Sequence, residues 1–256
     1  MHKFYSSFII IFFLSNLLCA KTTTLSTKNL ELIHIIGQQR MLSQQITKAY
    51  LYAGHQVSVD KANRQLRVAL NSFYKSYSTI NTSTKSTKIK KVMSFIKKSS
   101  DKFKSLSKKP MNKDNTKLIL ALSEEVLAKS KNIASLLKNS LHKEAYDSVI
   151  HATQQQMLAE KIAKYYIANQ SKIKDSTIEK HMRDSIKLFS KTHKVLMKNK
   201  KNTKRIKKRL KKVDEIWKII NRLYKNDKLS SIVFSLTDDI NKEMGEVTKL
   251  YMVAFR

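Results

Sequence analysis

Apolar residues recur at helical spacing along most of the chain. Ile35, Leu42 and Ile46 lie seven and four residues apart, which places them on one face of an amphipathic helix. Short stretches rich in Ser, Thr, Asn or Asp separate such segments, and Pro110 stands in one of them. The pattern predicts eight helices, over residues 24–53, 57–81, 85–108, 113–140, 143–170, 172–199, 203–226 and 229–254.

The first twenty residues follow a different pattern. Lys3 precedes an apolar run over residues 8–14, and small or apolar residues end the segment at Ala20. This order is typical of a secretory signal peptide, here residues 1–20, and its cleavage implies a periplasmic mature protein. An uncleaved membrane anchor is the alternative. Cleavage removes Cys19, the only cysteine, and leaves no second apolar span, so we expect a mature chain that does not cross the membrane.

An internal repeat divides the rest of the chain. Residues 38–53 align with residues 154–169 at an offset of 116, with seven identical residues among sixteen. A tandem duplication of four helices predicts two antiparallel four-helix bundles, in domains 24–140 and 143–254. The bundles could lie side by side, as an intrachain pseudo-dimer with parallel first and fifth helices, or end to end with the fourth helix running into the fifth. We favour the first arrangement.

The composition supports an all-α fold. The 256 residues include only three Gly and one Pro, too few for the turns of a β-sandwich or for the loops of a nucleotide-binding α/β fold. The chain also lacks the HExxH, CxxCH and P-loop motifs. Glu144, Asp147 and His151 share a predicted helix face, but a solvated face explains them. We therefore expect no enzymatic activity, no cofactor and no metal site.

The charge is strongly positive. Fifty-one Lys and Arg stand against nineteen Asp and Glu, for a net charge of +32. Such an excess suggests a polyanionic partner, but only eight of the basic residues are Arg, which is the residue that reads phosphates and bases with fixed geometry. Lysines cover every predicted helix, and the densest run, residues 198–212, fits one basic face of a packed helix. This distribution indicates a solvated surface and argues against a nucleic-acid partner.

The segment from Ile35 to Tyr50, IIGQQRMLSQQITKAY, carries the clearest functional signal. Its Gly, Gln, Arg-Met and Leu-Ser-Gln positions resemble the first helix of the PilJ-type sensor domain of type IV pili methyl-accepting chemotaxis transducers, which is related to NarX-like nitrate and nitrite sensors. Ile36 and Gln45 depart from that pattern, and the second copy has Gln156 where the first has Arg40. The resemblance implies a periplasmic four-helix sensor in which the motif Arg of paired first helices clamps a small anion.

Elementary chemistry points to the same helix. A Gly inside a helix costs about 1 kcal/mol relative to Ala, which indicates close approach of a neighbouring backbone or a ligand. An Arg beside hydroxyl and amide groups can donate several hydrogen bonds to a planar oxyanion. The candidate ligand-binding residues, which would face the sister helix, are Gly37, Arg40, Ser43, Gln44, Thr47 and Gln156.

Two observations leave the assignment of an anion site undecided. Arg40 could instead pair with an acidic residue of a neighbouring helix. Glu160 would repel an anion unless Lys48 or Lys161 compensates its charge. In the second repeat Asp238 aligns with Glu124, and such repeated acids fit interhelical pairs with lysines better than acid-base catalysis.

We therefore expect a stand-alone periplasmic sensor or ligand-binding protein. Its ligand would be a small anion such as nitrate or nitrite, and a membrane-bound signalling protein would receive its state. The alternative is a structural or adaptor protein whose basic surface docks on anionic envelope lipid, pili or nucleic acid.

Overall fold

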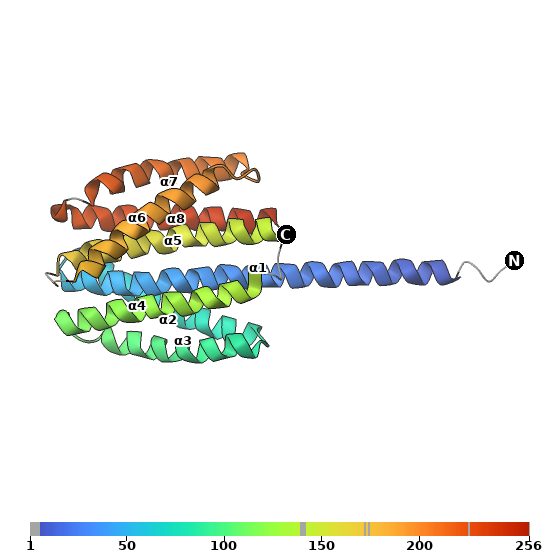
Figure 1. Ribbon diagram of the computed structural model, residues 1–256, viewed down its shortest axis with the longest axis horizontal. Coiled ribbons are helices and arrows are strands. Elements are labelled where there is room, and N and C mark those ends of the chain that lie inside the picture. Colours follow the sequence, from blue (N-terminus) through green and yellow to red (C-terminus); the bar gives the residue numbers. More distant parts are fainter. Residues whose placement is uncertain (1–5, 139–141, 172, 174, 225, 256) are drawn as a thin grey trace.

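Eight α-helices build the part of the protein that the computed structural model describes, residues 6–138, 142–171, 173, 175–224 and 226–255 (Figure 1). Side chains are described from residue 27 onward, except that of residue 227. No strand occurs in these ranges, so the predicted all-α fold of eight helices is confirmed. The helices are α1 (Ser6–Gly54), α2 (Val59–Ser83), α3 (Thr87–Leu106), α4 (Lys113–Leu137), α5 (Lys143–Asn169), α6 (Ser176–Met197), α7 (Lys204–Leu223) and α8 (Ser230–Ala254), with a 3₁₀ turn, η2 (Asp227–Leu229), before α8.

The predicted start of the first helix was wrong. We placed it at residue 24, whereas α1 begins at Ser6 and continues beyond the other helices (Figure 1). The physical reason is that no Gly or Pro occurs before Gly37, so nothing in this stretch stops a helix. Residues 1–5 of the predicted signal peptide lie outside the described residues, as do the side chains of its remainder, so the signal peptide stays a prediction.

Polar side chains fix several of the helix starts. Asn112 accepts a hydrogen bond from the backbone N–H of Asn115 at 2.8 Å, and Asp175 accepts one from Thr177 at 2.9 Å. Thr203 does the same for α7. These caps satisfy N–H groups that the first turn of a helix leaves free.

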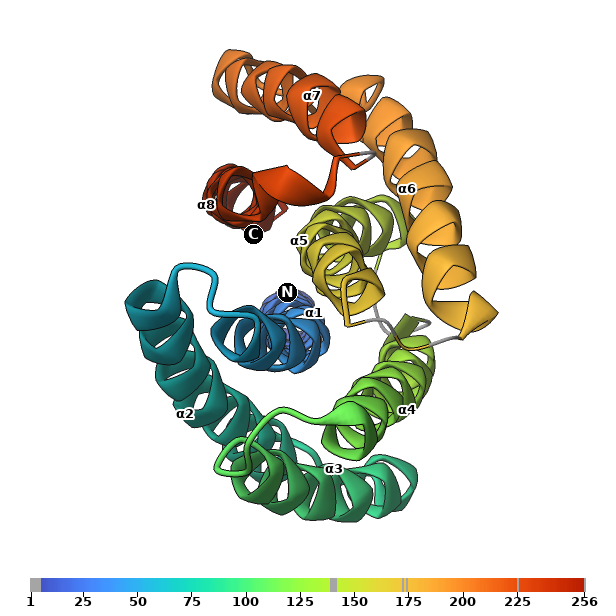
Figure 2. The same cartoon turned by 90° about the vertical axis from the view of Figure 1, so that its left-hand side faces the viewer.

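The helices pack as two groups of four around α1 and α5. α1 contacts α2 and α4, with α3 bridging α2 and α4, and α5 contacts α6 and α8, with α7 between them (Figure 2). α1 and α5 lie side by side at the centre and form the seam between the groups. Contacts of Gly37 with Thr153 and of His55 with Ser171 keep the same sequence offset, so the two helices are parallel.

Both central helices are buried on nearly all sides. Most of α5 from Ala145 to Ala168 is shielded from solvent, because α1, α6 and α8 cover its faces. Such a helix must place polar residues inside the protein wherever its sequence carries them, and each needs a partner there. Among the residues with described side chains, no helix is long and apolar enough to cross a membrane.

Candidate functional site

Gly37 marks the closest approach of α1 and α5. A Cβ atom built at this position would lie 2.4 Å from the Cβ of Thr153, a separation that real side chains do not tolerate. Thr153 occupies the equivalent position in the second repeat. The Gly therefore serves helix packing, as one of the two readings of the sequence predicted.

Arg40 lies one turn further along α1 and is only 7% exposed. Within the described part of the chain, no carboxylate lies within ion-pairing distance of its guanidinium, and its Nε has no hydrogen-bond acceptor. Burial lowers the pKa of Arg40, while the hydroxyl of Tyr146 opposes this shift. Because Tyr146 on α5 donates a hydrogen bond to the Ala134 carbonyl of α4, Arg40 sits where α1, α4 and α5 meet. The alternative reading, an ion pair with a neighbouring helix, is not what the structure shows.

The other predicted residues of α1 face α4. Gln44 donates to the Ser123 carbonyl at 3.0 Å, and Thr47 contacts the Ile119 carbonyl at 3.4 Å. Ser43 donates to the Arg40 carbonyl within its own helix at 2.8 Å. All three side chains are fully buried.

Gln156 lies on the opposite side of the seam. Its amide donates to the Asn241 carbonyl of α8 at 3.1 Å, and no hydrogen bond joins it to Arg40 among the described residues. The expectation that Arg40 and Gln156 face each other across one site is therefore wrong. The reason is geometric. In parallel, equivalent helices, positions that face the axis between them meet, as Gly37 and Thr153 do, whereas positions beside that axis point to opposite sides of it.

Two buried lysines, which we did not assign to the site from sequence, hold the seam together. Lys48 of α1 crosses to the other group and lies 2.8 Å from Glu160 of α5 and 3.1 Å from Asp238 of α8. Lys61 also binds Asp238 at 2.8 Å. We call this set of two lysines and two carboxylates the α8 side of the seam. It also answers the question about Glu160, because Lys48 compensates its charge.

Lys164 of α5 makes the equivalent crossing in the other direction. Its Nζ donates to Gln44 at 2.7 Å, to Ser123 at 2.9 Å and to Glu124 of α4 at 2.7 Å. Lys161 also binds Glu124. We call these residues, together with Arg40, the α4 side of the seam.

The pKa shifts on the α4 side follow from burial and pairing. Burial lowers the pKa of Lys164 to about 8, although Glu124 favours its charged form. Burial by itself raises the pKa of Glu124, but the attraction of Lys164 and Lys161 outweighs burial and lowers this pKa to about 2. On the α8 side, burial raises the pKa of Glu160 against the attraction of Lys48.

The two sides differ in charge although Lys48 and Lys164, and Asp238 and Glu124, occupy equivalent positions of the two repeats. The α8 side balances two lysines with two carboxylates. The α4 side has Lys161 and Lys164 against Glu124, and also Arg40, which lies beside Tyr146 and is paired with none of these three. At equivalent positions the first repeat has Arg40 where the second has Gln156, and Gln44 where the second has Glu160, whereas Lys61 and Lys161 have no lysine at the equivalent position of the other repeat. Among the described residues of the α4 side, Arg40 is the basic residue without a carboxylate partner.

The sequence contained a signal for the crossed lysine pairs. Lys48 and Lys164 are among the identical residues of the repeat, and Glu124 aligns with Asp238. We predicted pairing of these acids with lysines, which is confirmed, but sequence alone did not show that the partners belong to opposite repeats.

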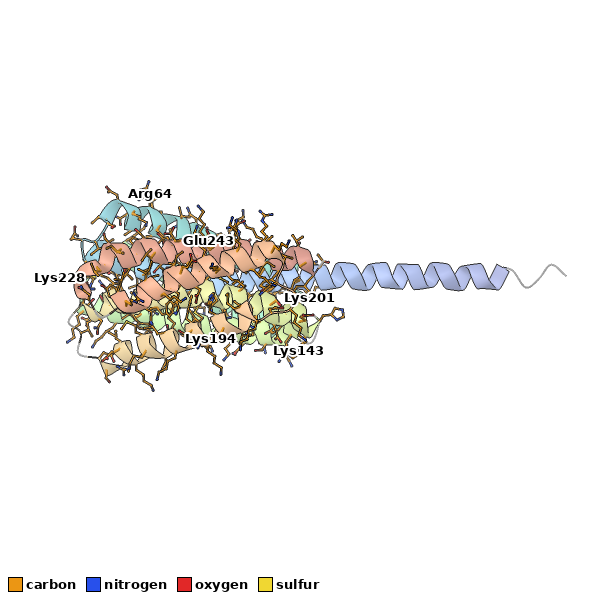
Figure 3. All side chains as sticks on the ribbon, turned by 90° about the horizontal axis from the view of Figure 1, so that it is seen from above. Arg64, Lys143, Lys194, Lys201, Lys228 and Glu243 are labelled. Atoms are coloured by element: carbon orange, nitrogen blue, oxygen red, sulfur yellow. The ribbon has the colours of Figure 1, made fainter. Side chains whose placement is uncertain are left out.

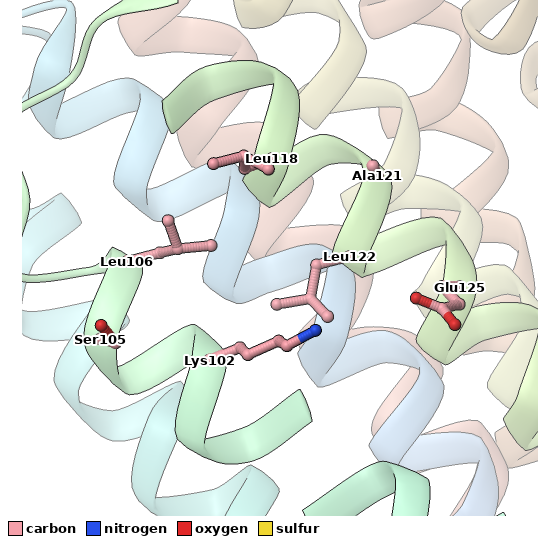
Figure 4. Close-up of a pocket in the computed structure, with 7 residues that line it drawn as sticks. All are labelled: Lys102, Ser105, Leu106, Leu118, Ala121, Leu122 and Glu125. Carbon is pink, nitrogen blue, oxygen red and sulfur yellow. The ribbon is translucent and has the colours of Figure 1, made fainter. Parts of the chain in front are cut away.

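Other features of the described surface lack such chemistry. A cleft of about 370 Å³ opens between α3 and α4, away from the predicted residues (Figure 4). It is lined by Lys102, Ser105, Leu106, Leu118, Ala121, Leu122 and Glu125. No group of three His, Cys, Asp or Glu side chains suited to a metal ion occurs among the described residues.

Neither the protein-family models, nor the curated proteins, nor the solved structures match the chain.

Proposed function

We propose that this protein binds a small anion on the α4 side of the seam, with Arg40 as the principal ligand. The anion would be planar and of nitrate or nitrite type, and binding would be reported to a membrane-bound signalling protein outside the cytoplasm. The observation that carries the proposal is a buried guanidinium with no carboxylate partner among the described residues.

The energetic argument rests on the cost of that arrangement. An unpaired buried charge costs several kcal/mol, and folding alone gives no reason to keep it. The equivalent position carries a neutral Gln156, which shows that an amide suits such a site. A bound anion would offset the cost at Arg40, because a guanidinium donates charge-assisted hydrogen bonds to planar oxyanions in a fixed fork.

Neighbouring groups support the choice of a small ligand. Ser43, Gln44 and Thr47 are already bonded to backbone carbonyls, and the three donor bonds of Lys164 are in use. Arg40 therefore supplies the free donors, with the Tyr146 hydroxyl beside it. A ligand with two or three oxygens matches this limited set better than a large metabolite.

The position of Arg40 also supports a sensory role. An anion held where α1, α4 and α5 meet would favour one packing of these helices over another, and a change in packing is what a partner protein can detect. The resemblance of the α1 sequence to sensor domains is consistent with this role.

Thermal unfolding at constant ionic strength tests the proposal. Nitrate is exchanged for chloride at fixed total salt, because general screening would stabilise so basic a protein without any site. We expect a saturable rise in Tm with nitrate or nitrite. The variant Arg40→Gln, which copies the second repeat, should abolish that rise. Arg64→Gln, at an exposed arginine, is the matched control and should retain it.

The same variant separates a ligand site from a structural arginine. In buffer without the anion, Arg40→Gln should be more stable than the native protein by about 1–3 kcal/mol, because a buried unpaired charge is removed. A loss of stability, together with an unchanged response to every anion tested, would show that Arg40 serves the fold alone.

A structural or adaptor role is the second candidate. The observation that favours it is a group of unpaired basic residues at one end of the bundle. Its test is a binding assay with polyanions rather than with small ions.

A further inference from the structure

Three of the connections between helices lie at the same end of the helical bundle. The α2–α3, α4–α5 and α6–α7 connections all lie at the end from which α1 extends (Figure 1). Lys143 and Lys201 mark this end, and Lys228 marks the opposite one (Figure 3). We call it the α1 end.

Basic side chains dominate the α1 end. Lys143 forms an ion pair with Asp147, and Glu144 lies beside it. The other basic residues of these connections are exposed and form no ion pair with a described residue. They are Lys85, Lys88, Lys138, Lys198, Lys200, Lys201, Lys204 and Arg205.

The packing of α7 accounts for only part of this charge. Residues 204–212 include seven Lys or Arg and no acid, at the N-terminal end of a helix whose dipole favours negative groups. Arg209 and Lys212 pair with Glu243 of α8, whereas the other five form no ion pair with a described residue. Lys204 and Lys208 are also like charges spaced four residues apart, which destabilises a helix slightly. A partner that carries negative charge would offset both costs.

Apolar groups accompany the basic ones. A cleft of about 340 Å³ at this end is bordered by Leu30 and Phe255 as well as by His142, Lys143 and Lys201. Its remaining lining residues are Glu144 and Ala145. Next to the α6–α7 connection, Val195 and Met197 are 48% and 41% exposed. Exposed aliphatic side chains beside lysines suit a surface that offers both negative charge and hydrocarbon.

We propose that the α1 end docks on the surface of an anionic phospholipid bilayer. The phosphate groups of the lipids would pair with the lysines of the three connections, and Val195 and Met197 would enter the headgroup layer. A bilayer fits better than a nucleic acid because α1 leads from this end toward the apolar run of residues 8–14. If that run is retained as an anchor, it holds the α1 end next to the membrane. This inference is independent of the anion site.

A vesicle-binding assay with the full chain tests the proposal. Vesicles of phosphatidylcholine with one third phosphatidylglycerol are compared with vesicles of phosphatidylcholine alone. The test variant replaces Lys198, Lys200 and Lys201 by Gln. The control replaces Lys108, Lys109 and Lys113 by Gln and therefore has the same net charge. These exposed lysines belong to the α3–α4 connection and the first residue of α4, and that connection lies at the opposite end (Figure 1). Both variants keep the same N-terminal segment, so its contribution cancels in the comparison.

We expect binding to the anionic vesicles only, weakened about 100-fold in the test variant and less than threefold in the control. The factor follows from about 1 kcal/mol per basic residue near an anionic surface. Equal losses in the two variants would overturn the proposal, because they would show attraction to net charge alone. So would tighter binding to a single-stranded oligonucleotide at equal phosphate concentration, lost in the same test variant. Circular dichroism and thermal unfolding check that both variants fold.

Discussion

Removal of Lys48 should destabilise the protein more than removal of Lys164, although the two lysines of the seam are equally buried. Lys48 and Lys164 both have fully buried side chains, and each crosses to a carboxylate of the other four-helix group. The two variants differ in the carboxylate that would lose its lysine partner. The Glu160 side chain is fully buried, whereas that of Glu124 is 26% exposed and keeps Lys161 as a partner at 2.5 Å.

These differences set the expected magnitudes. Lys48→Met leaves a buried carboxylate without its cation, which costs about 3–5 kcal/mol and lowers Tm by about 6–20 °C in a chain of this size. Lys164→Met removes charged hydrogen bonds but strands no buried charge, so we expect a loss of about 1.5–3 kcal/mol. Urea unfolding at pH 7, followed by circular dichroism, measures both.

A second substitution tests the cause. Glu160→Gln removes the stranded charge and should restore part of the stability that Lys48→Met loses. Lys48→Met should also be less damaging at pH 5 than at pH 8, because an unpaired Glu160 binds a proton more readily in the folded state than in the unfolded one, so stability falls as pH rises. Equal losses for the two lysine variants, or no recovery with Glu160→Gln, would refute this account of the seam.

Three further predictions concern single positions. Gly37→Ala should destabilise the protein by about 1–3 kcal/mol despite the better helix propensity of Ala, because the new Cβ would collide with Thr153. Gly245→Ala should be neutral or stabilising, because its Cβ would meet only the flexible side-chain amide of Gln156, at 3.3 Å. Urea unfolding compares the two variants. His193 is buried, and both of its ring nitrogens lack a hydrogen-bond partner in the described structure. Burial lowers its pKa below 6.5, so protonation costs stability as the pH falls below about 6.5. Thermal unfolding at several pH values should show this loss in the native protein but not in His193→Leu. Glu124, with a pKa of about 2, should contribute about 3 kcal/mol that is lost as pH falls from about 5 toward 2, and a series of unfolding curves for Glu124→Gln should lack that part of the loss.

Much of the helical layout could be predicted from sequence, because it depends on local signals. Apolar spacing and turn residues placed seven of the eight helices within four residues of their observed ends. The start of α1 was missed, since it depends on the absence of a stop signal rather than on the presence of one. Gly37 was recognised as a close-packing position because its cost within a helix is a local property that asks for an explanation.

The geometry of the site was less accessible to sequence. The spacing of Arg40, Gln44 and Thr47 correctly places them near one another along α1, but it cannot show which neighbouring helix they meet. Likewise, the repeat revealed that Lys48 and Lys164 are equivalent, but not that each pairs with the other repeat. Such contacts depend on how four helices from two repeats surround the seam, which is a property of the assembled structure.

The duplication within one chain has a physical consequence for the proposed anion site. In a symmetric dimer of a single module, each substitution occurs on both sides of the interface, so a buried unpaired Arg would have to be accommodated twice. In this chain the two sides can differ, and the α8 side keeps a balanced set of buried ion pairs that joins the two groups of helices. The α4 side is then free to carry the excess charge of Arg40, because the seam does not depend on it alone. A fused pair of repeats can therefore keep the structural ion pairs on one side and place the proposed anion site on the other.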